Sequence, residues 1–143
     1  MEKKILGRTG LEVPIVGLGT LFIGSRERMG GPGDLDEELG VQTVVAAIEA
    51  GSTWIDTAPL YGGTVCEKII GRALRERPDL AAICTVTTKV GRLREGSDYS
   101  CDAVMRSVEA SQERLGLERF DLVYIHDATG IRMEEVMGKD RAL

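Results

Sequence analysis

The sequence predicts an α/β protein with a parallel sheet, built from about four βα units and preceded by a short β-hairpin. Short segments rich in β-branched residues alternate with longer segments whose apolar residues recur at helical spacing. The predicted strands end near Gly19, Asp56, Lys89 and His126, so the repeat is 37, 33 and 37 residues long. The 143 residues, 43% hydrophobic and 29% charged, are sufficient for one globular domain over residues 1–143.

The first 35 residues are predicted to form a hairpin, a strand and a long loop. Short apolar pieces flank the turn sequence Gly7-Arg8-Thr9-Gly10, which indicates a hairpin over residues 3–14. Residues 15–19 then have the apolar character of a buried strand. Residues 20–35 are rich in glycine and contain Pro32, so they predict a long loop of the kind that often carries function.

Three helices are predicted from apolar faces and stop signals. The first ends near Gly51, and its apolar face is Val41, Val44, Val45 and Ile48. The second begins near Thr64, whose spacing to Glu67 is that of a capping box. The third spans residues 102–115 and ends at Gly116. The inward faces expected for the second and third helices are Cys66, Ile69, Ile70, Ala73 and Leu74, and Val104, Met105, Val108 and Leu115.

Three further strands are predicted, over residues 53–55, 83–90 and 120–125. Residues 133–143 have the pattern of a fourth helix without a cap, glycine or proline at its end, so the chain looks truncated there. The repeat alone is compatible with an open doubly wound sheet and with a barrel. In both, chemistry gathers at the C-terminal ends of the parallel strands.

Four polar side chains stand at or near those strand ends: Asp56, Tyr61, Lys89 and His126. Each also has a structural interpretation. Asp56 can cap a turn, Tyr61 can cover the core, Lys89 can be a solvated charge, and His126 can be a hydrogen-bonded structural residue. Together they can move a proton, because a tyrosine acts as an acid or base near neutral pH only beside a cation that favours its phenolate. Lys89 would be that cation, Asp56 would hold it, and His126 would orient the reacting oxygen.

The candidate residues stand in the segments Asp56-Thr57-Ala58-Pro59-Leu60-Tyr61-Gly62, Thr88-Lys89-Val90-Gly91 and Asp121-Leu122-Val123-Tyr124-Ile125-His126. Further segments are Gly7-Arg8-Thr9-Gly10-Leu11, Gly17-Leu18-Gly19-Thr20 and Arg114-Leu115-Gly116. In these motifs, which span nearly the whole chain, the sequence resembles the aldo-keto reductase family. Tyr61-Gly62-Gly63-Thr64 and His126-Asp127 are most similar to the branch that oxidises aldoses such as galactose or fucose at C1.

This resemblance implies a parallel (β/α)8 TIM barrel of which the chain holds about the first four βα units, the N-terminal half. It implies hydride transfer between a nicotinamide cofactor, NADP or NAD, and a small-molecule carbonyl or sugar substrate. The residues that match the family's catalytic tetrad are Asp56, Tyr61, Lys89 and His126. The cofactor positions are Gly19, Thr20 and Asp56, and the substrate positions are Leu21, Phe22, Trp54 and His126.

Two further interpretations belong to other classes. In one, the chain is a catalytically inactive half-barrel that retains the tetrad, because the family's later strands supply most of the cofactor contacts. Its open sheet edges then favour self-association or association with a partner chain. In the other, a flavodoxin-like binding domain, a fifth strand is required and none is found. A Rossmann dinucleotide fold is disfavoured because Phe22 stands where its motif requires a third glycine.

Composition excludes several kinds of partner. The net charge of −5 provides no basic footprint for nucleic acid, and no stretch approaches the ~18 apolar residues of a membrane span. No apolar run after Lys3-Lys4 has the form of a signal peptide, so the expected location is cytoplasmic. Cys66, Cys84 and Cys101 are 18 and 17 residues apart, which predicts reduced thiols and no metal site.

Overall fold

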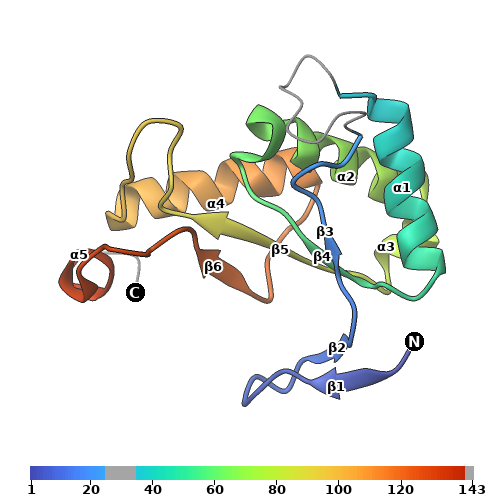
Figure 1. The fold of residues 1–143 in the computed structure, drawn as a ribbon, viewed down its shortest axis with the longest axis horizontal. Coiled ribbons are helices and arrows are strands. Elements are labelled where there is room, and N and C mark those ends of the chain that lie inside the picture. The colour runs from blue at the N-terminus through green and yellow to red at the C-terminus, as the bar shows by residue number, and fades with distance from the viewer. Residues whose placement is uncertain (25–34, 141–143) are drawn as a thin grey trace.

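A computed structural model describes residues 1–24 and 35–140 and contains the predicted parallel sheet (Figure 1). Four strands pair in chain order: β3 (Leu18–Gly19), β4 (Trp54–Asp56), β5 (Thr85–Val90) and β6 (Val123–Ile125). Every neighbouring pair in this sheet is parallel, so the C-terminal ends of the strands share one edge. A separate antiparallel hairpin, β1 (Lys3–Ile5) with β2 (Glu12–Pro14), precedes the sheet as predicted.

Helices alternate with the strands along the chain, and the longer ones lie on one side of the sheet, whereas the last helix lies beyond the end of β6 (Figure 1). They are α1 (Glu37–Glu49), α2 (Val65–Glu76), α3 (Pro78–Ala81), α4 (Cys101–Leu115) and α5 (Met133–Met137), with a 3-10 helix η2 at Tyr61–Thr64. The side chains of Asp36 and Ser100 cap α1 and α4 by accepting from the N–H groups of Leu39 and Ala103. α1 and α4 end beside Gly51 and Gly116, where the stop signals were expected.

The core fills the space between the sheet and the helices. Ile55 and Val86 point toward the helices, while Asp56 and Lys89 belong to the opposite face of the same strands. The buried cluster is Ile23, Val41, Val44, Ile48, Ile55, Cys66, Ile69, Ile70, Ala73, Leu74, Leu80, Val86 and Leu115. The predicted inward faces of α1 and α2 are therefore confirmed, with Val45 packed against the cluster and partly buried.

The predicted capping box at the start of α2 is wrong. Thr64 has a left-handed φ of 79° and makes no side-chain cap bond. Glu67 does not reach back to residue 64, because its carboxylate is fully buried and engaged elsewhere. It accepts a hydrogen bond from the Thr88 hydroxyl at 2.7 Å and pairs with the Arg114 guanidinium at 2.7 Å. Long-range partners therefore replaced the local cap that the spacing indicates.

Three further predictions are wrong, two about where a strand begins and one about a residue on a helix face. Only Leu18–Gly19 of the predicted strand 15–19 forms a strand, and Ile15 and Val16 are exposed. Ile83 is exposed and precedes β5, because the short helix α3 and a turn occupy the preceding residues. Met105 is exposed, whereas the predicted burial of Leu115 on the same helix is confirmed and Ser111 is buried beside it. The predicted loop over residues 20–35 and the predicted last helix lie partly outside the described residues.

Glu67 and Arg114 form an ion pair that connects three elements. Glu67 on α2 bonds Thr88 on β5 and Arg114 on α4, and Arg114 also donates to the Ser111 hydroxyl at 3.0 Å. The helices approach closely there, because a side-chain carbon added at Gly71 would collide with the backbone of residues 114 and 115. The pair therefore fixes α2 and α4 against β5, an inner strand of the sheet.

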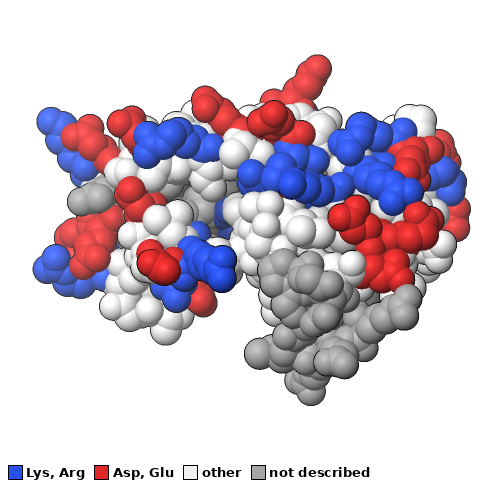
Figure 2. Space-filling model, turned by 90° about the horizontal axis from the view of Figure 1, so that it is seen from above, with Lys and Arg blue, Asp and Glu red and all other residues white. Residues whose placement is uncertain are grey.

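Charge is mixed over the surface of the described residues. Figure 2 shows Lys and Arg interspersed with Asp and Glu on the face seen from above. Several of these charges form ion pairs, among them Arg72 with Glu38 and Glu76, and Arg77 with Glu49 and Asp79. Across residues 1–24 and 35–140, no helix combines the length and apolar character that crossing a bilayer requires.

Removing Arg114 is expected to destabilise the fold strongly. In Arg114→Met the fully buried Glu67 carboxylate loses its counter-charge, and breaking such a pair typically costs about 3–5 kcal/mol. Urea unfolding of both proteins measures the difference. The control Arg119→Met removes a mostly exposed partner of Asp121, and we expect a change within ~0.5 kcal/mol. Equal effects of the two substitutions would contradict the role given to the Glu67 pair.

Candidate active site

The four predicted catalytic residues are brought together at the C-terminal edge of the sheet. Asp56 is the last residue of β4, Lys89 lies one residue before the end of β5, and His126 directly follows β6. Tyr61 begins the 3-10 helix after β4, where Gly62 and Gly63 take left-handed φ values of 57° and 61°. The register of the parallel strands thus places side chains from three strand ends at one rim.

The Lys89 ammonium is held by two oxygen atoms. Its Nζ donates to Asp56 Oδ2 at 2.7 Å and to the carbonyl oxygen of Thr57 at 2.9 Å. The Lys89 and Asp56 side chains are 14% and 32% exposed, so the pair is only partly screened by water. An ammonium has three N–H donors, and these bonds occupy two of them.

Tyr61 lies between Lys89 and His126. The centre of its ring is 4.7 Å from Lys89 Nζ, within the range of a cation–π contact. The Tyr61 and His126 rings meet edge to face, with centroids 5.9 Å apart and planes at 89°. All three side chains are half-buried. A phenol, an ammonium and an imidazole therefore converge on one small area of the rim.

The imidazole of His126 is held in its neutral form at pH 7. Burial lowers the pKa of His126 below its ordinary value of about 6.5, and the positive charge of Lys89 lowers it further. Asp127 and Asp56 act in the opposite direction. Because the unfolded chain takes up this proton at a higher pH, the contribution to stability is lost as the pH falls below about 6.5. A neutral imidazole can donate one hydrogen bond and accept another.

Two threonines that the motif analysis did not assign to the tetrad fix Asp56. The N–H and the hydroxyl of Thr20 both donate to the Asp56 carbonyl oxygen, at 3.0 and 2.9 Å. The Thr87 hydroxyl lies 3.4 Å from Asp56 Oδ1 and donates to the Ile55 carbonyl at 3.2 Å. The signal for Thr87 was its strand position, because residues 87 and 89 alternate onto the same face of β5.

The predicted cofactor and substrate positions are distributed over the sheet. Gly19 pairs with Asp56, and a side-chain carbon at Gly19 would meet no atom within 4 Å, so the rim is open there. Leu21 and Phe22 follow this strand end and are 48% and 42% exposed. Trp54 instead begins β4, and its ring packs on Gly17 at the other end of the strands.

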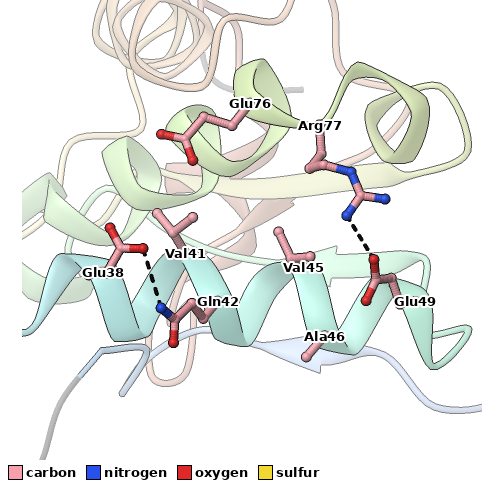
Figure 3. Close-up of a pocket in the computed structure, with 8 residues that line it drawn as sticks. All are labelled: Glu38, Val41, Gln42, Val45, Ala46, Glu49, Glu76 and Arg77. Atoms are coloured by element: carbon pink, nitrogen blue, oxygen red, sulfur yellow. Dashed lines mark hydrogen bonds and ion pairs between the residues drawn. The ribbon is translucent and has the colours of Figure 1, made fainter.

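A groove with a cavity volume of about 420 Å³ lies on the helical side, between α1 and the end of α2 (Figure 3). It contains none of the four predicted catalytic residues. Its glutamates are already paired, since Arg72 holds Glu38 and Glu76 while Arg77 holds Glu49. The groove is therefore separate from the candidate site, and the negative charges of its glutamates are balanced by the two arginines.

The cysteines take no part in the site. All three are free, and burial raises the pKa values of the Cys66 and Cys84 thiols to about 11, so neither is a thiolate at neutral pH. Among the residues that the structure describes, no group of His, Cys, Asp and Glu side chains is arranged to hold a metal ion.

Comparison with known proteins identifies the family. Residues 15–139 match the aldo/keto reductase family. The chain belongs to this family. It is 36% identical to L-galactose dehydrogenase of Arabidopsis thaliana over 139 residues, which cover 97% of this chain and 42% of that protein. It is 38% identical to pyridoxal 4-dehydrogenase of Microbacterium luteolum, over 88% of this chain and 43% of that protein.

The comparison with solved structures confirms the predicted barrel class. The holo form of an aldo-keto reductase from Bacillus halodurans superposes with a TM-score of 0.71 at 29% identity, over 86% of this chain and 39% of that one. The four βα units are thus those of the N-terminal part of the aldo-keto reductase barrel. The chain spans less than half the length of these relatives.

Replacing Lys89 by methionine is expected to raise the pKa of His126. The substitution removes a positive charge that disfavours the imidazolium, while the neighbouring Asp127 remains. The chain has a single histidine, so its imidazole proton resonance can be followed through a pH titration by NMR. Lys68→Met, which removes an exposed lysine from α2, is the matched control and is expected to leave the titration unchanged. An unchanged titration in Lys89→Met would contradict the described geometry.

Proposed function

We propose that the chain carries the proton-transfer site of an NAD(P)-dependent oxidoreductase that interconverts a carbonyl and a hydroxyl group. The observation that supports this most directly is the position of Lys89. Its ammonium is anchored by Asp56 and Thr57 and lies 4.7 Å from the Tyr61 ring, which in turn meets His126. These are the groups that a reversible proton transfer to a carbonyl oxygen requires.

Each residue has a distinct task in this proposal. Tyr61 donates a proton to the carbonyl oxygen during reduction and accepts it from the hydroxyl during oxidation. Lys89 favours the phenolate form through its charge, and Asp56 fixes the ammonium in place. The neutral His126 donates a hydrogen bond to the same substrate oxygen and orients it toward Tyr61.

The residues at the strand end suit a nicotinamide cofactor, NAD or NADP. Gly19 leaves open space beside Asp56, and a flat ring needs such a surface without a side chain. The residues that would line this position are Gly19, Thr20 and Asp56. Thr20 would contribute by fixing the backbone of Asp56 through its bonds to the Asp56 carbonyl. When bound, the cofactor supplies or accepts the hydride, whereas the proton is moved by the chain's own side chains.

For the substrate we propose an aldose oxidised at C1. The support is the 36% identity to a protein named L-galactose dehydrogenase and the motif around Tyr61 and Gly62. The C1 hydroxyl of a cyclic sugar would lie at Tyr61 and His126. Leu21 and Phe22, both exposed beside the rim, would contact its apolar face, whereas Trp54, at the start of β4, would lie at the opposite end of the strands from the sugar's C1.

A second candidate is a half-barrel that functions through association. Strand β3 has only two residues and is an edge of the described sheet, and the apolar side chains of Ile15 and Val16 directly before it are 53% and 56% exposed. Exposed apolar residues next to a strand with one unpaired edge favour pairing with another chain. We propose a second copy of this chain as that partner.

Cofactor binding and turnover are expected to respond differently to Tyr61→Phe. The substitution keeps the ring beside Lys89 and removes the hydroxyl that carries the proton. We expect saturable quenching or enhancement of NADH or NADPH fluorescence in the micromolar range for both proteins. Oxidation of L-galactose is expected to fall at least about 100-fold in the variant, the size typical of general acid–base catalysis.

The binding measurement serves as the internal control for the turnover measurement. Binding without turnover in Tyr61→Phe supports the enzymatic role. Absence of binding by the unsubstituted chain would contradict catalysis by this chain and favour the associating half-barrel. Equal turnover in both proteins would remove Tyr61 from the mechanism.

Self-association is expected to depend on the β3 edge. Light scattering after size exclusion should give about twice the 15.5 kDa chain mass for the unsubstituted protein. Ile15→Lys places a charge at this edge and is expected to restore the monomer mass. Ile83→Lys changes an isoleucine of similar exposure, 58%, before β5, and should leave the dimer intact. A monomeric unsubstituted chain would contradict the proposed association with a second copy.

A further inference from the structure

Tyr99 is a buried aromatic residue that the motif analysis did not single out. It lies between β5 and α4, is only 4% exposed, and donates a hydrogen bond from its hydroxyl to the carbonyl oxygen of His126 at 3.0 Å. The bond joins residues 27 positions apart in the sequence. It connects the backbone of a candidate catalytic residue to the segment between β5 and α4.

The Tyr99 ring is seated against Gly91. Gly91 directly follows β5, has a left-handed φ of 89°, and has no room for a side chain because an added carbon would collide with the Tyr99 ring. Any other residue at this position would therefore displace the ring as well as strain the backbone. The Tyr99 hydroxyl is thus directed by close packing and not only by its own hydrogen bond.

The segment that presents Tyr99 is closed by its own hydrogen bonds. Arg92 and Ser97 form an antiparallel bridge, the Leu93 N–H donates to the Gly96 carbonyl at 3.1 Å, and the Asp98 N–H donates to the Gly91 carbonyl at 2.8 Å. Tyr99 therefore stands on a structured turn between β5 and α4. Because the turn fixes its backbone and Gly91 fixes its ring, the Tyr99 side chain can hold the His126 carbonyl in one position.

The backbone at His126 needs such a partner because the strand ends there. The His126 N–H still donates to the Val90 carbonyl at 2.9 Å, but Asp127 has a left-handed φ of 54° and turns the chain out of the sheet. The His126 carbonyl therefore lies beyond the hydrogen bonds between the parallel strands, and it accepts its hydrogen bond from the Tyr99 hydroxyl. This carbonyl and the imidazole belong to the same residue, so a fixed backbone fixes the Cα–Cβ bond from which the imidazole extends.

We propose that Tyr99 is a positioning residue that fixes the backbone of His126 and thereby keeps its imidazole edge-on to the Tyr61 ring. The seat on Gly91, the hydroxyl bond to His126 and the T-shaped ring contact form one connected path. Its catalytic consequence rests on the proposed function, whereas the placement of His126 can be measured without any turnover.

The test uses NMR of the single histidine in the intact chain and in Tyr99→Phe. The variant keeps the ring on Gly91 and removes only the donor hydroxyl, so the fold is expected to persist, as a thermal melt verifies. Ring-to-ring contacts between His126 and Tyr61 should be seen as NOEs in the unsubstituted chain and should weaken in the variant. The charged groups that act on His126 are Lys89, Arg92, Asp56 and Asp127.

The titration midpoint of His126 is the second readout. Release of the imidazole from burial and from Lys89 is expected to raise its pKa toward the ordinary value in Tyr99→Phe. Tyr124→Phe removes a hydroxyl from a tyrosine of β6 that is 38% exposed and keeps its ring, whose centre is 5.9 Å from Lys89 Nζ, so both readouts should stay unchanged. A merely structural role of Tyr99 would lower the melting temperature without moving the titration.

Two results would overturn the proposal. The first is a folded Tyr99→Phe variant with the same His126 midpoint and the same NOEs to Tyr61. The second needs no variant, namely the absence of NOEs between the Tyr99 ring and the Gly91 α protons in the unsubstituted chain. Loss of NAD(P)H binding would refute the proposed function and leave these NMR results unaffected, so the two failures are distinguishable.

Discussion

The hydrogen-bonded ion pair between Lys89 and Asp56 is the interaction on which the arrangement of the candidate site depends. The ammonium is shared between a carboxylate oxygen and the Thr57 carbonyl, and both ionic side chains are largely shielded from water. A charge-assisted bond in such surroundings is stronger and more directional than one at the surface. Tyr61 and His126 are then placed relative to the ammonium, since the phenol ring lies against it and the imidazole lies against the phenol ring.

Strand β5 can hold Lys89 in place because the strand is fixed on both of its faces. Lys89 points toward Asp56 on one face, and the next residue back, Thr88, donates to the buried Glu67 on the other. Burying the Glu67 carboxylate has a large desolvation cost, which the structure offsets with the Arg114 guanidinium and the Thr88 hydroxyl. A shift of β5 by one residue would exchange the two faces and break both sets of bonds, so the register is strongly specified.

The sequence was informative where the signal was periodic and misleading where a spacing had two possible uses. Strand ends that recur every 33 to 37 residues correctly placed Asp56, Lys89 and His126 at one rim, because parallel strands share an edge. Thr64 and Glu67 had the spacing of a local cap, yet Glu67 pairs with a residue 47 positions away. Tyr99 was missed because its role depends on the backbone of Gly91 and His126, which no side-chain pattern encodes.

The groups that set the geometry of the proposed proton-transfer site all come from the same four βα units. Thr20 and Thr87 hold Asp56, Thr57 and Asp56 hold Lys89, and the backbone of His126 is bonded at Val90 and Tyr99. The positions of the proposed acid–base residues are therefore fixed by contacts within this stretch of the chain. Hydride transfer requires in addition that a nicotinamide be held against that geometry, since correct orientation of two reactants supplies much of the lowering of a barrier. The contacts within these units therefore account for the placement of the four side chains, and the binding of a nicotinamide against them is a separate requirement.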